Sequence, residues 1–149
     1  MNKEAVFEQL KIDEGVVYEI YEDHLGYATF GVGHLVLESD PEHGEPVGTP
    51  VSEERVRECF EKDLQTAIDE CVVLYKDSWE TFPGEVQEVL VNMLFNLGRP
   101  RLSKFKNFNA KLIAGDYAGA APEGLDSIWA RQVGNRAIRL MERLENVSN

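Results

Sequence analysis

The stretch IDEGVVYEIYEDHLGYATFGVGH, residues 12–34, changes from a helical pattern to an extended one within a few positions. Residues 17–21 and 27–32 are rich in the β-branched and aromatic side chains that favour strands. The four residues DHLG between these runs have turn chemistry, and their glycine can take a positive φ. The sequence therefore predicts a helix that ends near Glu14, followed by a β-hairpin.

Three polar side chains of this stretch are candidates for chemistry. Glu14 lies at the expected helix end, Asp23 in the hairpin turn and Thr29 in the second strand. The hairpin would fold Asp23 and Thr29 back toward Glu14, and two carboxylates beside a hydroxyl can hydrolyse a glycosidic bond by acid/base catalysis. Because 27 of the 149 residues are acidic, the spacing alone also fits solvated carboxylates, an Asx turn at Asp23 and an ordinary strand threonine.

The composition is that of an ordinary soluble globular protein, with 43% hydrophobic and 28% charged residues. A chain of 149 residues is expected to form one domain with a real core. No apolar run approaches the ~20 residues that span a bilayer, so we expect no membrane insertion. The N-terminus lacks the apolar segment of a secretory signal.

The cysteines argue against a disulfide and a metal site, and the net charge argues against a nucleic-acid-binding protein. Cys59 and Cys71 fall on one predicted helix, where a rise of ~1.5 Å per residue separates them by roughly 18 Å, too far for a disulfide. No metal-type spacing surrounds either residue, so we expect free, buried or half-buried thiols and no metal site. The formal net charge of −12 argues against nucleic-acid binding, which requires a basic surface.

The rest of the chain is predicted to be mainly helical. A proline- and glycine-rich loop at residues 37–50 is followed by a long helix over residues 52–75, which begins with a favourable N-cap serine. Further helices are expected by apolar periodicity at about 2–14, 85–97, 105–113, 117–121, 125–129 and 134–144, with residues 99–101 as a connection.

With these motifs in place, the chain resembles the phage-type lysozymes, glycoside hydrolase family 24. The matching residues are Asp13-Glu14-Gly15, Tyr21, Asp23, Gly26-Tyr27, Thr29, Gly31, Gly33-His34, Leu35, Asn92-Met93, Phe95, Gly98, Trp129 and Asn135-Arg136-Ala137. The resemblance covers nearly the whole chain. It implies an α+β, mainly α-helical, lysozyme-like two-lobed fold in a single domain, residues 1–149. The lobes expected are a small β-hairpin lobe at about 13–55, a linking helix at about 53–75, and a larger helical lobe of about 1–12 and 76–149.

The resemblance also implies an activity, that of an endolysin or muramidase. Such an enzyme hydrolyses the β-1,4 bond between N-acetylmuramic acid and N-acetylglucosamine in peptidoglycan. Glu14 would be the general acid, with a raised pKa, while Asp23 would activate a water molecule held by Thr29. The reaction would invert the anomeric configuration, which requires a carboxyl separation of roughly 6.5–9.5 Å. No metal or organic cofactor is implied.

Supporting and substrate-binding residues are implied in the same way. His34 would form a structural pair with Asp63, since no second ligand at metal spacing accompanies it. Arg136 would reach Glu14 and oppose the effect of burial on its pKa, with a weak surface ion pair as the alternative. The residues expected to contact substrate are Leu35, Phe95, Asn96, Phe108 and Glu123, although core packing is an equal alternative for the two phenylalanines.

The expected partner is bacterial peptidoglycan, bound by a monomer. Without a signal peptide, the protein would stay in the host cell cytoplasm until a holin or a virion brings it to the wall. Bacterial walls are anionic, so a net charge of −12 removes long-range attraction and leaves binding to cleft contacts. Two alternatives stay open: a lytic transglycosylase, in which a single acid suffices because the sugar's own hydroxyl attacks, and a non-catalytic wall-binding virion protein.

Overall fold

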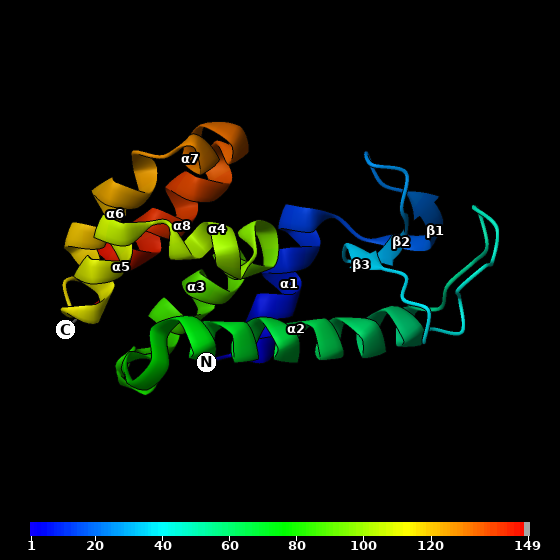
Figure 1. The fold of residues 1–149 in the computed structure, drawn as a ribbon, viewed down its shortest axis with the longest axis horizontal. Coiled ribbons are helices and arrows are strands. Elements are labelled where there is room, and N and C mark those ends of the chain that lie inside the picture. Colours follow the sequence, from blue (N-terminus) through cyan, green and yellow to red (C-terminus); the bar gives the residue numbers. More distant parts are fainter. Residues whose placement is uncertain (148–149) are drawn as a thin grey trace. The chain divides into compact units, whose positions relative to one another are not determined.

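The computed structural model describes residues 1–147 and shows a mainly helical chain with one small sheet (Figure 1). Its backbone contacts divide into two compact units. The N-terminal unit is Glu4–Thr66, and the C-terminal unit is Met1–Lys3 together with Ala67–Asn149. The first helix therefore groups with the sheet, whereas the resemblance placed residues 1–12 in the helical lobe. The reason is local packing, because the rings of Phe7 and Phe60 lie 4.5 Å apart within the N-terminal unit.

The N-terminal unit contains the predicted helix and hairpin. Its elements are α1 (Lys3–Glu14), β1 (Val17–Glu22), β2 (Ala28–Gly31), β3 (His34–Leu35) and the first part of α2 (Glu53–Tyr75). Gly15 follows α1 with a φ of +78°, which a helix-ending glycine adopts without steric cost. The predicted helix end at Glu14 and the predicted hairpin are both confirmed.

The sheet is antiparallel in the order β1-β2-β3. Tyr21 of β1 lies opposite Thr29 of β2, and Thr29 lies opposite Leu35 of β3. Residues that face each other across an antiparallel ladder project from the same face, so these three side chains form one row across the sheet. Ile20 and Phe30, which alternate with the row, are buried in the core of the unit.

The loop predicted at residues 37–50 contains no helix and returns along the free edge of β1. The backbone N–H of Ile20 donates to the carbonyl of Thr49, and Gly48 donates back to Ile20, at 2.9 and 2.8 Å. Val51 completes the edge by donating to Tyr18. These bonds satisfy the polar groups of an edge strand that would otherwise be open.

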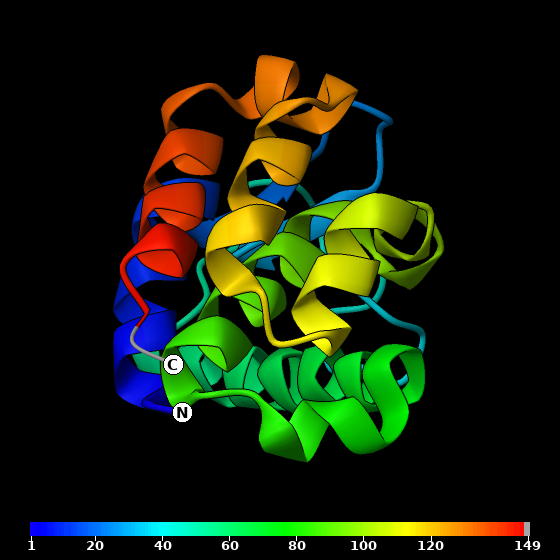
Figure 2. The same ribbon diagram turned by 90° about the vertical axis from the view of Figure 1, so that its left-hand side faces the viewer.

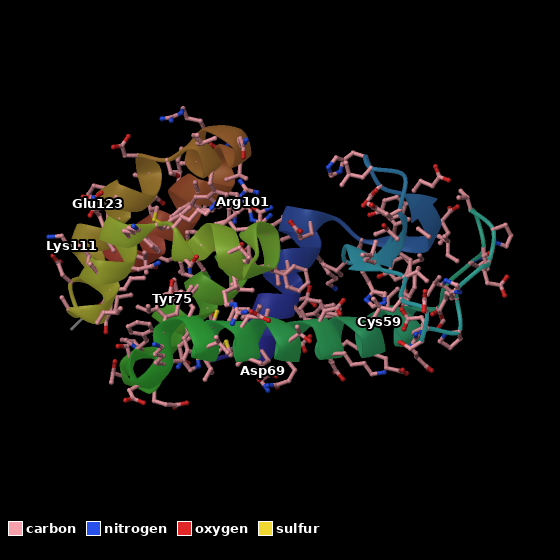
Figure 3. The ribbon with its side chains drawn as sticks, viewed as in Figure 1. Cys59, Asp69, Tyr75, Arg101, Lys111 and Glu123 are labelled. Atoms are coloured by element: carbon pink, nitrogen blue, oxygen red, sulfur yellow. The ribbon has the colours of Figure 1, made fainter. Side chains whose placement is uncertain are left out.

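Helix α2 spans 23 residues, close to the bounds predicted for it. The Ser52 hydroxyl accepts a hydrogen bond from the Arg55 N–H at 3.1 Å, which caps the helix start. Its buried positions follow a helical period and include both cysteines, which are free thiols. Cys59 is labelled on α2 in Figure 3. Burial raises the pKa of this thiol to about 11 and that of Cys71 to about 12.

The C-terminal unit is built from short helices around the apolar helix α3. Figure 2 shows α6 and α8 side by side within this unit. The elements are the last part of α2, from Ala67, and η1 (Lys76–Thr81), α3 (Gly84–Leu97), α4 (Arg99–Ser103), α5 (Lys106–Ile113), α6 (Tyr117–Leu125), α7 (Ile128–Val133) and α8 (Asn135–Glu145).

Three helix predictions in this unit are wrong in their bounds. Residues 99–101 form the start of α4 and not a connection, because a proline is favoured in the first turn of a helix. Helix α6 continues to Leu125 and includes Pro122. The helix expected at residues 125–129 begins later, after Ser127, whose hydroxyl accepts the Ala130 N–H at 3.1 Å and caps α7.

Candidate active site

Asp23 occupies the turn of the β1–β2 hairpin. Its Oδ1 accepts hydrogen bonds from the backbone N–H groups of Leu25 and Tyr27, both at 2.9 Å. These bonds, that of Tyr27 first and that of Leu25 as well, outweigh desolvation and hold the pKa of Asp23 below its usual value. A carboxyl group with a lowered pKa is ionised at neutral pH, which is the state required of a general base.

Thr29 lies in the row that crosses the sheet. The residue is only 4% exposed, and its hydroxyl donates to the Tyr27 carbonyl at 2.9 Å. A hydroxyl that donates its proton still has oxygen lone pairs that can accept a hydrogen bond from water. The same Tyr27 backbone therefore binds Asp23 through its N–H and Thr29 through its carbonyl.

Glu14 is the last residue of α1 and is half-buried. A Cβ atom at Gly33, in the turn between β2 and β3, would lie 3.9 Å from Glu14 Oε1, so the carboxylate faces that turn. Burial raises the pKa of Tyr21, and the negative charges of Asp23 and Glu14 raise it further. Tyr21 lies opposite Thr29 across the ladder.

The N-terminal unit therefore brings together four of the residues singled out from the sequence. Asp23 and Thr29 share the Tyr27 backbone, Glu14 faces the turn between β2 and β3, and Leu35 extends the row of Thr29, with 47% of its surface exposed. Two carboxylates, one beside a buried hydroxyl, with an accessible apolar side chain in the row, are suited to binding a sugar and cleaving its glycosidic bond by acid/base chemistry.

His34 lies on the opposite side of β3, where it is buried. Its Nδ1 is 2.7 Å from Asp63 of α2, as predicted, and its Nε2 is 2.8 Å from Asp40 in the loop. With both ring nitrogens facing carboxylates, the imidazolium form can donate to each of them. Burial alone would lower the pKa of His34, but the bonds and charges of Asp63 and Asp40 outweigh it and raise the pKa.

Arg55 extends this cluster from the start of α2. It donates through Nε and Nη2 to both oxygens of Glu42 at 2.9 Å, and through Nη2 to Asp40 at 3.2 Å. Burial would raise the pKa of Asp40, but the Leu37 N–H, His34 and Arg55 together hold that pKa below its ordinary value. The cluster ties β3, the loop and α2 together behind the candidate catalytic face.

The remaining candidates belong to the C-terminal unit. Arg136 is buried on α8, where its Nε donates to Asn92 Oδ1 at 3.0 Å. Asn96 accepts a hydrogen bond from Trp129 Nε1 at 2.7 Å. Phe95, on α3, is half-buried. The buried bond of Arg136 and the partly buried bond of Trp129 fix the side chains of α3 against those of α8 and α7.

Phe108 and Glu123 line one pocket of about 470 Å³ in the C-terminal unit. Figure 3 labels Glu123 on α6 and Arg101 on α4, two of the residues that line it. Phe108 is 1% exposed and packs edge-to-face against Phe105, with ring centroids 6.0 Å apart. It therefore has a core role, and the substrate contact expected for it remains a prediction.

Within residues 1–147, no group of three or more histidine, cysteine or acidic side chains is arranged to hold a metal ion. In the same part of the chain, no helix is both long and apolar enough to cross a membrane.

The sequence that carries these side chains matches a known protein family. The sequence model of the phage lysozyme family matches residues 11–146. The chain belongs to the phage lysozyme family. The matched region contains every candidate residue named above, from Glu14 to Arg136. The family has the lysozyme-like α+β fold expected from the sequence, and its members are glycoside hydrolases of the lysozyme type, as this chain is.

Individual phage lysozyme relatives differ in how much of their length the chain covers. It is 30% identical to the probable T4-type lysozyme 1 of Dictyostelium discoideum, over 95% of the chain and 94% of that protein. It is 28% identical to probable T4-type lysozyme 2 of the same organism, over 93% and 92%. It is also 27% identical to the pre-baseplate central spike protein Gp5 of Enterobacteria phage T4, over 91% of the chain but only 27% of that protein.

Two features of this phage lysozyme were not predicted as parts of the site. Tyr21 was only one of the matching residues, yet it lies opposite Thr29 in the row that crosses the sheet. The strand alternation of residues 17–21 was the signal that could have placed it on the face of Thr29. Asp40 and Arg55 had no comparable signal, because a loop aspartate near a helix start is indistinguishable from other surface charges.

Proposed function

We propose that this phage lysozyme is a muramidase. It would hydrolyse the β-1,4 bond between N-acetylmuramic acid and N-acetylglucosamine in bacterial peptidoglycan. The observation that carries the proposal is geometric: the Tyr27 backbone joins the Asp23 carboxylate to the Thr29 hydroxyl, and the Glu14 carboxylate faces the turn between β2 and β3. The family match over residues 11–146 supports the same reaction.

The two carboxylates have different roles in the proposed reaction. Glu14 protonates the glycosidic oxygen as the leaving sugar departs. Asp23 is ionised and takes a proton from the attacking water through Oδ2, which makes neither of the hydrogen bonds to the turn backbone. Thr29 accepts a hydrogen bond from the same water and orients it. Attack from the face opposite the leaving group inverts the anomeric configuration.

The other candidates bind or support the substrate in this proposal. Leu35 provides an apolar contact beside the catalytic row, and Phe95 and Asn96 contribute from α3. Phe108 and Glu123 act through the pocket that they share. Arg136 is proposed as a supporting residue, and the pair of His34 with Asp63 is proposed to hold β3 against α2.

One alternative is a lytic transglycosylase, in which the sugar's own hydroxyl attacks and a second carboxylate is unnecessary. The presence of Asp23 and Thr29, joined through the Tyr27 backbone, favours water as the nucleophile. A second alternative is a virion protein that binds the wall without cleaving it. The similarity to the phage T4 spike protein Gp5 favours a virion context, which is compatible with an active enzyme.

One assay separates the three functions. Purified peptidoglycan is incubated with the wild type and with Glu14→Gln, and the soluble products are analysed by mass spectrometry. We expect reducing-end muropeptides from the wild type and a loss of activity of about 10²–10⁴-fold in Glu14→Gln. Products with only 1,6-anhydro ends would identify a transglycosylase. Binding to peptidoglycan without any soluble product would identify a wall-binding protein.

A further inference from the structure

Tyr27 is the residue through which the hairpin holds both the proposed base and the proposed water ligand. Its backbone N–H donates to Asp23 Oδ1 at 2.9 Å. Its carbonyl accepts the backbone N–H of Asp23 and the hydroxyl of Thr29, both also at 2.9 Å. One residue therefore fixes Asp23 and Thr29 relative to each other. The proposed reaction uses this backbone but makes no use of the phenol ring that the same residue carries.

The ring of Tyr27 projects from the face of the sheet that carries Thr29. The last ladder pair before the turn is Glu22 with Ala28. The bond from the Asp23 N–H to the Tyr27 carbonyl continues this pairing by one position. Side chains two positions apart on an extended strand point to the same face of the sheet. The phenol ring therefore lies beside the hydroxyl of Thr29, on the face where the proposed reaction takes place.

Most of this side chain is accessible, although its neighbour Thr29 is buried. Tyr27 is 57% exposed. Within residues 1–147, its ring packs against no other aromatic ring and its hydroxyl makes no hydrogen bond. Neither aromatic packing nor hydrogen bonding therefore occupies the phenol, which is free to contact a ligand bound on this face.

The chemistry of the proposed reaction decides which sugar lies against this face. The attacking water, held by Asp23 and Thr29, approaches the anomeric carbon from the side opposite the leaving group. Side chains next to these two residues therefore face the sugar under attack, the glycone. A pyranose ring presents axial C–H groups, which the negatively charged face of an aromatic ring attracts. Leu35, which lies opposite Thr29 on β3, adds an aliphatic contact on the same face.

We propose that Tyr27 is a sugar-binding residue, whose ring packs against the N-acetylmuramic acid that the water attacks. The inference rests on the proposed muramidase function and adds a substrate contact to it. Because the ring and the groups that hold Asp23 and Thr29 belong to one residue, a sugar on the ring is in register with both. The ring contacts the sugar in the ground state and in the transition state alike. Its loss should therefore raise KM and leave kcat nearly unchanged.

Three variants separate the ring from the rest of the residue. Tyr27→Leu removes the aromatic face, Tyr27→Phe keeps it and removes only the hydroxyl, and Tyr18→Leu is the matched control. Tyr18 belongs to β1 of the same sheet, is 42% exposed, and lines a different cavity together with Phe7 of α1 and Val56 of α2. The backbone N–H and carbonyl of Tyr27 remain in every variant, so the melting temperatures should stay close to that of the wild type.

Hydrolysis is measured on soluble, uncross-linked peptidoglycan strands over a range of concentrations. For Tyr27→Leu we expect KM to rise about three- to tenfold, as for the loss of one aromatic contact, with kcat nearly unchanged. Tyr27→Phe and Tyr18→Leu should keep the wild-type KM. The contact itself is detected by NMR in Glu14→Gln carrying ¹³C-labelled tyrosine. Nuclear Overhauser effects from tyrosine ring protons to sugar C–H protons are expected, and they should disappear when Tyr27→Leu is added.

The outcomes separate this inference from the function on which it rests. An unchanged KM in Tyr27→Leu, or a fall in kcat alone, would overturn the sugar contact while leaving the muramidase function in place. An equal rise of KM in Tyr27→Phe would assign the effect to the hydroxyl, and one in Tyr18→Leu would assign it to the sheet in general, so either would also overturn the contact. Failure of the wild type to release soluble products from the strands would instead overturn the proposed function.

Discussion

Asp23 holds the hairpin turn and is also the proposed base, and one substitution separates these two tasks. Asp23→Asn keeps an oxygen that can accept the N–H groups of Leu25 and Tyr27, so the melting temperature should change little. The amide cannot take a proton from water, so the rate of peptidoglycan hydrolysis should fall by about 10²–10⁴-fold. Both quantities are measured on the same preparation, by thermal unfolding and by product release.

Asp23→Ala is the matched control for that experiment. It removes the acceptor as well as the base, and leaves the two N–H groups of the turn without the partner that they have in the wild type. We expect lower thermal stability than in Asp23→Asn, with activity reduced to a similar extent. An Asp23→Asn variant that retains wild-type activity would show that the carboxylate is needed only for the turn.

The individual site residues differ in how far the sequence could place them. Glu14, Asp23 and Thr29 could be identified from the sequence because a helix end and a hairpin turn have strong local signals. The contact of Phe108 with Phe105, and its burial at 1% exposure, depend on how α5 packs. A helical period shows that a phenylalanine faces inward but not whether a substrate reaches it.

His34 connects three elements, and its protonation should govern their stability. The pKa of His34 is raised in the folded protein by Asp63 and Asp40, against the effect of burial. Stability from this source is therefore fully present below the unfolded pKa of about 6.5 and is lost as pH rises through the folded pKa. Asp40 has a lowered pKa, so its contribution is lost as pH falls through that folded value.

Denaturant unfolding of the wild type and of His34→Gln between pH 4 and pH 9 checks this account. We expect the difference in unfolding free energy to be largest below the unfolded pKa of histidine and to shrink as the pH rises through the folded pKa. Both proteins should still release muropeptides. A difference that grows with pH would show that neutral His34 is the stabilising form.

The helices and strands differ in whether a local sequence pattern is sufficient to predict them. The β1–β2 hairpin and α2 were predicted because their turn residues, cap and apolar period lie within the elements themselves. Strand β3 has only two residues and exists because it pairs with β2. Helix α4 has only five residues, too few to show an apolar period, and residues 99–101 were predicted as a connection although proline is favoured at a helix start.

The composition does not show how the charge is divided between the two units. A net charge of −12 describes the chain, but the division into a neutral unit and an acidic unit becomes visible only when the contacts define the units. The acid, the base and the hydroxyl proposed for catalysis all lie within the acidic unit.

The source of the new hydroxyl group on the product tests the central claim most directly. Peptidoglycan is digested by the wild type in H₂¹⁸O, and the muropeptides are analysed by mass spectrometry. Attack by a water activated by Asp23 places one ¹⁸O atom at the new reducing end of each muramic acid. Unlabelled products with 1,6-anhydro ends would show that the sugar's own hydroxyl is the nucleophile and would contradict the account.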